Sequence, residues 1–458
     1  MNYLTKSQQF VQRLNQYGMV KGKIYYFIVY LTLVANISFG FQSNPDLSKA
    51  VFLSNEDTLI DWSGEVNVEQ ITSNSSPNWF GYYDKFQTDP SGRYVLGMRV
   101  DSMFRSPTQV DTLHLGIIDL EDGNRWREIG TSTAWGWQQG CMLQWIPGAE
   151  EEIIWNDRQN GSFVSRIYNS RTGAIRTLPK PIYALSPDGT FAVGTDFNRI
   201  QNMRPGYGYP GIEDEYKDVK APAETGIYKM DLKTGESKLI ISLAEIAAIP
   251  NKDGLIAPEY FHYFNHLLIS PDSKRLVFLH RYKKLNPALG RSGGGFGTRM
   301  VTSNLDGSDI YMLDPSGFTS HFIWKNSNKI TAWTKPEGKT EAFYTFTDIT
   351  DEVELVGEYA MTVNGHNTYV PNTNYEWIIN DSYPQGKDRM QILYLYHVPS
   401  NKKIVLGNFH EPAQFTGEWR CDLHPRVSRN GGYLIFDSTH QGGKRQIYKV
   451  DISFLGLQ

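Results

Sequence analysis

The feature that most constrains the fold of this chain is a strand, turn and strand unit that recurs seven times. In each unit an apolar run leads into a short turn and a second apolar run follows, as in Ser270-Pro-Asp272 before Arg275-Leu-Val-Phe278. Periods of about 40 to 55 residues made of short strands are typical of β-propellers. The turns lie at residues 89–92, 146–148, 186–189, 270–272, 325–327, 370–372 and 428–431. The sequence therefore predicts an all-β fold, a seven-bladed β-propeller.

Two of the units carry long insertions. One runs from Met203 to Tyr263 and contains a predicted short helix from Leu239 to Ile249, and the other is the glycine-rich stretch 290–297. A phosphate-binding loop would need a following Lys-Ser or Lys-Thr between a strand and a helix, and the glycine-rich stretch lacks that context. We therefore expect long inserted loops on one face of the propeller, where loops commonly carry function.

Four histidines occupy one matching position in four successive units. His266, His321, His366 and His424 each stand four residues before the first residue of the turn. The chain has ten histidines in 458 residues, so four of them in phase indicate a common role. Equivalent positions of a radially repeating fold point toward a common axis. The sequence therefore predicts a ring of imidazoles at the centre.

Such a ring suits a divalent metal ion, either zinc, manganese or calcium. We predict that the four phased histidines supply its ligands. Metal-bound imidazoles need neighbours that fix their tautomer, and the nearest candidates in sequence are Asp422, Cys421 and Asn265. The alternative is a water-filled channel in which the histidines hydrogen-bond to the backbone.

The N-terminus carries an apolar run at residues 24–40, preceded by Lys21 and Lys23 and closed by small residues. The pattern is typical of a secretory signal cleaved near Gly40, and the run also approaches the ~18 residues with which an uncleaved anchor spans a bilayer. We expect residues 1–40 to be a signal peptide or N-terminal anchor and residues 41–458 to form a single propeller domain. The mature protein is expected to be secreted or periplasmic.

The composition of the chain limits the classes of partner that it is expected to bind. The net charge of −4 gives no long-range attraction to nucleic acid or to an anionic membrane. The two cysteines, Cys141 and Cys421, provide no disulfide framework. Aromatic residues make up 13% of the chain, which suits both β-sheets and sugar-stacking surfaces. We expect a monomer with no nucleic-acid partner and no membrane contact beyond the N-terminal signal.

A second constellation lies in the third unit, where Ile182 takes the position of the phased histidines. Tyr183 follows it, and Arg199 comes sixteen residues later, after one hairpin turn. That spacing lets two adjacent antiparallel strands bring Tyr183 and Arg199 to the same mouth of the channel. The alternative is that Tyr183 is a packing residue, because most of the 27 tyrosines are expected to pack in the core.

Five stretches together resemble a known family. They are Trp79-Phe-Gly-Tyr-Tyr-Asp-Lys85, the tryptophan-rich segment 134–145, Arg204-Pro-Gly-Tyr-Gly-Tyr209, Phe264-Asn-His-Leu267 and Arg420-Cys-Asp-Leu-His-Pro-Arg426. They are similar to segments of propeller-type polysaccharide lyases, namely the oligogalacturonate lyases and especially the seven-bladed ulvan lyases. The resemblance covers nearly the whole of the chain after residue 40.

The resemblance implies β-elimination on a uronate-containing glycan. It implies that Tyr183 acts as base and acid and that Arg199 offsets the uronate carboxylate, and we add His266 to this catalytic group. Ulvan lyases supply a further histidine from the second blade, where this chain has glutamines. In oligogalacturonate lyases a histidine cluster holds a divalent metal, which the segment around His424 resembles. We expect the substrate to be bound by Gln138, Gln139, Arg204, Tyr207, Tyr209 and Arg281.

Three functions follow in order of preference. The first is a secreted lyase acting on an anionic polysaccharide or oligosaccharide, with a sulfated, ulvan-like glycan as one form of the substrate. The second is a non-catalytic carbohydrate-binding or sensor propeller, motivated by the glutamines in place of the histidine. The third is a periplasmic protein-interaction propeller. A peptidase is excluded because no room remains for an α/β domain with a Gly-x-Ser-x-Gly nucleophile motif.

Overall fold

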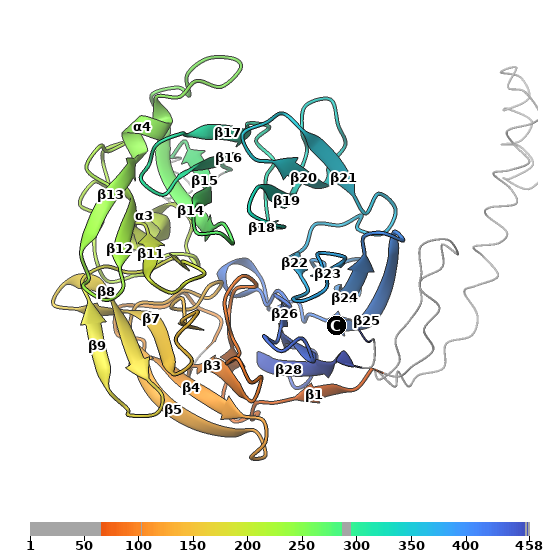
Figure 1. Cartoon of the computed structure of the whole chain (residues 1–458). Helices are drawn as coiled ribbons and strands as arrows, with labels where there is room; N and C mark the ends of the chain where they lie inside the picture. Colours follow the sequence, from red (N-terminus) through yellow and green to blue (C-terminus); the bar gives the residue numbers. More distant parts are fainter. Residues whose placement is uncertain (1–65, 102, 286–294, 454–455, 457–458) are drawn as a thin grey trace, which may run out of the picture. The chain divides into compact units, whose positions relative to one another are not determined.

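The computed structural model describes residues 66–101, 103–285, 295–453 and 456. They form seven four-stranded antiparallel sheets around a central axis (Figure 1). This arrangement confirms the predicted seven-bladed β-propeller. Each of the seven predicted turns connects the innermost strand of its blade to the next strand, as the turn at 270–272 does between β14 (Phe261–Ile269) and β15 (Arg275–Lys283).

Six blades are built from four consecutive strands each. The first three are β2 (Asn78–Trp79), β3 (Tyr94–Arg99), β4 (Leu113–Asp119), β5 (Arg125–Ser132); β6 (Gln144–Trp145), β7 (Glu152–Gln159), β8 (Ser162–Asn169), β9 (Ile175–Leu178); and β10 (Ala184–Leu185), β11 (Phe191–Gly194), β12 (Gly226–Asp231), β13 (Ser237–Ser242). The next three are β14, β15, β16 (Gly297–Asn304), β17 (Tyr311–Asp314); β18 (Phe322–Trp324), β19 (Lys329–Thr334), β20 (Ala342–Thr347), β21 (Val353–Val356); and β22 (Thr368–Tyr369), β23 (Trp377–Asn380), β24 (Met390–His397), β25 (Lys402–His410).

The seventh blade is closed by both ends of the described chain. Its strands run in the order β1 (Val68–Gln70), β28 (Gln446–Asp451), β27 (Tyr433–Ser438) and β26 (Arg426–Val427). Strand β1 pairs antiparallel with β28, with Glu69 opposite Lys449. Their side chains also form an ion pair, with 2.9 Å between Lys449 Nζ and Glu69 Oε2. The ring of blades is therefore fastened through non-covalent contacts of residues far apart in the sequence.

Burial explains which strand takes which place in a blade. The second strand of the fourth blade, β15, is buried at eight of its nine positions, because it is covered by the blades on both sides. The outer strand β21 has no buried residue in its four positions. The inner strands of five blades have only two residues each, because the blades converge at the axis.

The insertion of the third blade differs from the sequence prediction. Residues 237–242 form strand β13, and the helix α4 is limited to Leu243–Ala247. Ser242 accepts a hydrogen bond from the backbone of Glu245, whose side chain bonds back to the backbone of Ser242. This capping box starts the helix at Leu243, so the predicted helix from Leu239 to Ile249 was too long.

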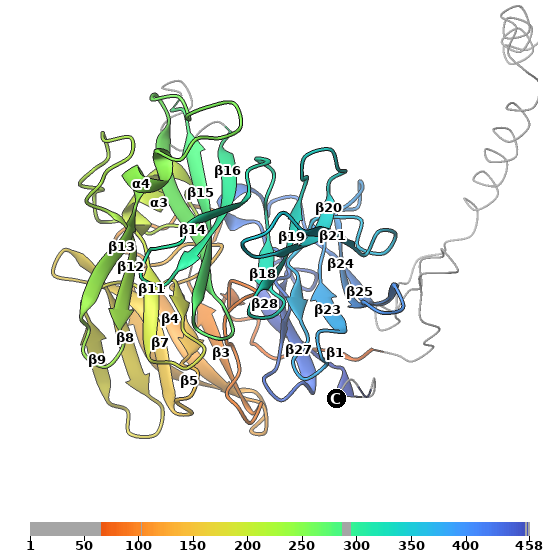
Figure 2. The same ribbon diagram turned by 45° about the horizontal axis from the view of Figure 1, so that its top comes forward.

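A second helix, α3 (Phe197–Met203), was not predicted. It follows β11 directly, and α3, α4 and the extended ends of β15 and β16 lie toward one side of the ring (Figure 2). The predicted signal segment, the domain boundary at residue 40 and most of the glycine-rich stretch fall outside the described residues. Within the described part, no helix has the length and apolar character needed to cross a membrane.

Candidate functional site

The four phased histidines meet at the axis of the propeller. The ring centroids of His321 and His366 are 4.0 Å apart, those of His366 and His424 4.2 Å, and those of His266 and His321 5.9 Å. All four side chains are buried. The structure thus brings together the residues that the repeat phasing placed on a common axis.

Two of these histidines have positive backbone φ angles, 54° at His266 and 44° at His424. At His266 the pairing of β14 with β15 shifts register between Asn265 and Leu268, so the histidine lies in a β-bulge. A left-handed conformation in a non-glycine residue costs roughly 1 to 3 kcal/mol and clusters at functional sites. The His266 ring at this bulge lies 5.9 Å from that of His321, so the bulge is part of the histidine cluster.

Two of the histidines combine with a carboxylate to form a candidate metal centre. Ligand atoms of His366, Asp422 and His424 all lie within 4.8 Å of one another. His366 Nε2, His424 Nε2 and Asp422 Oδ1 have no hydrogen-bond partner among the described residues. His366 Nδ1 lies 2.9 Å from Asp381 Oδ1, which leaves Nε2 as the nitrogen with a free lone pair.

This donor set fits a divalent cation. Buried polar atoms without partners are costly, and a cation would satisfy all three at once. Two imidazoles and one carboxylate suit zinc or manganese, whereas calcium prefers oxygen ligands only. Burial, with His366 and two nearby arginines adding to it, holds the pKa of His424 well below its usual range, so this ring is neutral at pH 7 and able to bind a metal.

The other two phased histidines are engaged with tyrosines. The Tyr82 hydroxyl is hydrogen-bonded to His266 Nε2, and the Tyr383 hydroxyl lies 3.3 Å from His321 Nε2. His321 Nδ1 lies 3.0 Å from Asn364 Oδ1. Of the four histidines predicted as metal ligands, His366 and His424 have an Nε2 atom without a partner among the described residues, whereas Nε2 of His266 and of His321 contacts a tyrosine hydroxyl.

Sequence reasoning missed the two tyrosines that fill the centre. The Tyr82 ring lies 4.8 Å from His266 and 5.1 Å from His424, and the Tyr83 hydroxyl donates a hydrogen bond to the carbonyl oxygen of Phe322. The chain turns into the axis at Gly81, where φ is 108° and a Cβ atom would lie 3.1 Å from the backbone of Gln139. These residues carry no repeat phase, and the only signal was their place in the segment 79–85 of the family resemblance.

Tyr183 lies beside the histidine cluster. Its hydroxyl accepts a hydrogen bond of 2.8 Å from the backbone N–H of His266 and lies 2.9 Å from Gln139 Nε2. Burial raises the pKa of Tyr183 well above its ordinary value, and these hydrogen bonds only partly offset that rise. Tyr183 is therefore held as a neutral phenol.

Arg199 does not lie on a strand adjacent to Tyr183, so the predicted pairing was wrong. It belongs to α3, and its guanidinium pairs with Asp214 at 3.2 Å. It also donates to backbone carbonyl oxygens of four residues, namely His262, Tyr216, Val219 and Lys220, at 2.6 to 3.0 Å. The side chain is 1% exposed. Its geometry is that of a residue that fastens the inserted loop.

Two other arginines, Arg281 and Arg204, lie close to each other and near Tyr207. Arg281 is 4% exposed, and no carboxylate pairs with it or with Arg204 in the part of the chain that the structure describes. Arg281 Nε donates to Asn265 Oδ1 at 2.9 Å. Burial and the nearby charge of Arg204 lower the pKa of Arg281 to about 10, so the guanidinium remains positive at pH 7. Phe296 lies against both guanidinium groups.

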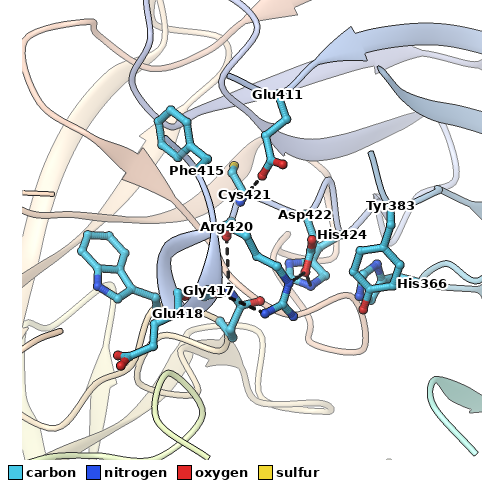
Figure 3. A network of polar contacts seen from close by, with 12 residues as sticks. His366, Tyr383, Glu411, Phe415, Gly417, Glu418, Arg420, Cys421, Asp422 and His424 are labelled. Carbon is cyan, nitrogen blue, oxygen red and sulfur yellow. Dashed lines mark hydrogen bonds and ion pairs between the residues drawn. The ribbon is translucent and has the colours of Figure 1, made fainter. Parts of the chain in front are cut away.

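Tyr207 is surrounded by positive charge. Its hydroxyl accepts a hydrogen bond of 2.7 Å from Arg420 Nη2 and one of 3.4 Å from Arg204 Nη2. Burial raises the pKa of a phenol, but here Arg204 and Arg420 outweigh burial and the negative charge of Asp422, so the pKa of Tyr207 is lowered. Arg420 also donates to Asp422 Oδ2 at 2.9 Å, next to His424 and His366 (Figure 3).

Three further predicted residues have interior positions. Gln138 Nε2 donates to the carbonyl oxygens of Glu418 and Arg420, so it supports the loop that carries Arg420. Tyr209 is fully buried and stacks on Phe197 at 4.2 Å between ring centroids, which makes it a core residue and corrects its assignment to the substrate. Burial raises the pKa of the Cys421 thiol, so this side chain is a neutral thiol.

Two solved structures share this architecture. An oligogalacturonate lyase from Vibrio parahaemolyticus matches with a TM-score of 0.59 and 16% sequence identity, over 86% of this chain and 96% of its own. An oligogalacturonate lyase in complex with manganese matches with a TM-score of 0.58 and 14% identity, over 86% and 95%. At these identities the likeness establishes the propeller fold. No protein-family model and no curated protein matches the chain.

Proposed function

We propose that this protein is a polysaccharide lyase that cleaves a uronate-containing polysaccharide or oligosaccharide by β-elimination. The observation that carries the proposal is the buried guanidinium of Arg281, which has no carboxylate partner among the described residues and lies beside Tyr183, Tyr207 and the histidine cluster. An uncompensated buried charge is costly unless an anion completes it. The shared fold with two oligogalacturonate lyases supports the same reading.

The chemistry explains why positive charge is needed. The C5 proton of a uronate becomes acidic enough to remove only when the adjacent carboxylate is neutralised. In our proposal Arg281 binds this carboxylate, and Arg204 adds positive charge next to it. Arg281 therefore takes the role that the family resemblance assigned to Arg199.

The two tyrosines divide the acid and base roles, because their environments move their pKa values in opposite directions. Tyr207, whose oxygen accepts hydrogen bonds from two guanidinium groups, removes the C5 proton as a phenolate. The electron pair of the C5–H bond forms the C4–C5 double bond, and the C4–O bond breaks. Tyr183, held as a neutral phenol, donates a proton to the departing oxygen. The reaction leaves Tyr207 as a phenol and Tyr183 as a phenolate, so Tyr207 must lose a proton and Tyr183 must regain one before the next turnover.

A divalent cation bound by His366, His424 and Asp422 would supply further positive charge to the site. Asp381 keeps the His366 imidazole in the metal-binding tautomer through its contact with Nδ1. Arg420 links this centre to Tyr207, since it contacts both Asp422 and the Tyr207 hydroxyl. Zinc and manganese are the candidates.

Metal analysis of protein purified without chelator should find about one zinc or manganese ion per chain. The double variant with His366→Ala and His424→Ala should lose the ion and melt at a lower temperature than the metal-loaded protein, because an ion bound only by the native state stabilises it. His114→Ala, at a partly exposed histidine on β4, is the matched control. Equal metal content in the double variant and this control would remove the site from the proposal.

The substrate and location extend the same proposal. The positive charges of Arg281 and Arg204 favour an anionic glycan, with a sulfated, ulvan-like polymer and a galacturonate polymer as the two candidates. We expect the protein to be secreted or periplasmic and to act as a monomer.

The proposal is tested by incubating the protein with polygalacturonate, ulvan and a neutral polysaccharide and following the ultraviolet absorbance of the unsaturated product. Elimination creates this chromophore and hydrolysis does not. Absorbance should rise with one of the two uronate polymers and not with the neutral one. Arg281→Ala should reduce the rate and weaken binding together, because the carboxylate is bound before and during the reaction.

A non-catalytic carbohydrate-binding propeller is the second candidate. It is favoured by the Gln139 side chain, whose Nε2 donates a hydrogen bond of 2.9 Å to the Tyr183 hydroxyl. Gln139 belongs to the segment in which the ulvan lyases have their further histidine. Binding of a uronate polymer that depends on Arg281, without any unsaturated product, would select this candidate over the lyase.

A further inference from the structure

A cavity lies on the turn side of the histidine cluster. It has a volume of about 350 Å³ and is lined by the turn-side ends of the inner strands, including Leu185, Ile269, Trp324 and Tyr369. The same strands carry or follow the phased histidines at their other ends, as His321 precedes Trp324 by three residues. We call this space the turn-face cavity.

The walls of the turn-face cavity are largely apolar. Its polar lining residues are Asp84, Lys85, Gln144, Thr368, Arg426 and Arg429. Side chains of Leu185, Ile269, Ile323, Trp324, Tyr369 and Val427 line it. Asp84 and Lys85 also line it and form an ion pair, with 2.8 Å between Lys85 Nζ and Asp84 Oδ2. Both side chains are more than nine-tenths buried, at 7% and 3% exposed.

The Asp84 carboxylate is not satisfied by this pair. Its Oδ1 atom has no hydrogen-bond partner among the described residues, and neither has Thr368 Oγ1, which lines the same cavity. An ammonium group has three protons to donate, and within the described residues Lys85 Nζ makes one hydrogen bond, to Asp84. Buried groups of this kind cost free energy unless a ligand or water completes them.

The charges restrict the head group of a ligand. Arg426 and Arg429 also line the cavity, but Arg426 is paired with Asp437 at 3.0 Å and Arg429 lies against the Phe86 ring. At the Asp84–Lys85 pair, a carboxylate would face Asp84 and an ammonium would face Lys85, so either would meet a like charge at close range. A neutral hydroxyl can donate to Asp84 Oδ1 and accept from Lys85 Nζ with a single oxygen atom. The apolar walls favour a hydrophobic body, and the volume is at the lower end of the range for small-molecule sites.

We propose that the turn-face cavity binds a small neutral molecule with an apolar, ring-sized body and one hydroxyl head group. The cavity adjoins the proposed lyase site, because Lys85 Nζ lies 5.3 Å from the centroid of the Tyr183 ring. The proposed ligand would use Asp84 and Lys85 and none of the residues assigned to the elimination. Tyr83 lines the cavity and its ring lies 5.4 Å from that of His366, so it forms the wall between the cavity and the histidine cluster.

The test uses 2-naphthol as the probe, measured by calorimetry on the full-length protein at pH 7. Three analogues vary the head group and keep the rings, namely 2-methoxynaphthalene, 2-naphthoate and 2-naphthylmethylammonium. We expect 2-naphthol to bind and each analogue to bind at least about tenfold more weakly, because a site that bonds a hydroxyl penalises its loss. Equal affinity for all four probes, or no binding of 2-naphthol, would overturn the proposal.

Two variants locate the site. Ile323→Phe should abolish 2-naphthol binding by filling the cavity, and Asp84→Asn should reduce the preference for 2-naphthol over 2-methoxynaphthalene. Leu355→Phe, at an exposed position on β21 of the same blade as Ile323, is the control and should bind like the wild type. Thermal unfolding of each variant without probe shows whether it is folded. Folded Ile323→Phe that still binds 2-naphthol would place the probe elsewhere and refute the assignment.

Discussion

Tyr207→Phe is expected to lower the rate of elimination by roughly 10²- to 10⁴-fold, the usual cost of losing a general base. The ring would remain packed while the oxygen that accepts hydrogen bonds from Arg204 and Arg420 is lost. The rate of the wild-type enzyme should rise with pH as Tyr207 loses its proton, at a pH below the ordinary tyrosine value of ~10. Initial rates across pH on a uronate polymer measure both effects.

A readout independent of activity separates this role from a structural one. The ultraviolet absorbance of phenolate should appear in the wild type at a lower pH than in Tyr207→Phe, since the pKa of Tyr207 is lowered. Tyr183→Phe should also slow elimination, through loss of the proton donor, but it should leave this low-pH phenolate signal in place. A Tyr207→Phe protein with near-normal turnover would return the base assignment to Tyr183.

Arg199→Ala is expected to reduce the free energy of unfolding by about 3 to 5 kcal/mol, the typical cost of removing one partner of a buried ion pair. The change would leave Asp214 as an unpaired buried charge and free four carbonyl oxygens of the inserted loop. Arg125→Ala, whose ion pair with Asp122 is exposed, should cost less than about 1 kcal/mol. Denaturant unfolding of both variants makes the comparison.

This experiment decides between two roles for Arg199. The family resemblance predicted that it neutralises the substrate carboxylate, whereas its contacts are those of a structural residue. If Arg199→Ala has wild-type stability and loses only turnover, the structural role is refuted and the original role stands. If it unfolds more easily and Arg281→Ala does not, the carboxylate-binding role belongs to Arg281.

The repeated turns were enough to predict the blades, because each turn and its flanking strands are specified by local sequence. The convergence of the four histidines followed from the same repeat, since equivalent positions must face one axis. What the repeat could not predict is contact between residues without phase. Tyr82 and Tyr83 enter the axis from a connecting segment, and no periodicity marks them.

The errors in the candidate site have one physical origin. The Tyr183 and Arg199 spacing was interpreted as a hairpin, but the chain leaves the blade after β11 and forms α3 in the insertion. Long-range packing then determines the partners of each side chain. Asp422 was found as a neighbour of His424 in sequence. The role that we propose for Arg281 depends on its having no carboxylate partner in the described part of the chain, and the sequence alone cannot show this.

The seventh blade and the candidate metal centre can be completed only late in synthesis of the chain. Strand β1 can pair only after β28 has been made, so the sheet stays incomplete until the last residues of the chain emerge. The same blade carries Asp422 and His424, whereas His366 precedes the first strand of the blade before it. A cation held by these three residues would bridge the last two blades to form. Such a bridge between two blades would slow the opening of the ring. A chain without β28 would leave the edge of β27 unpaired and open to pairing with other chains.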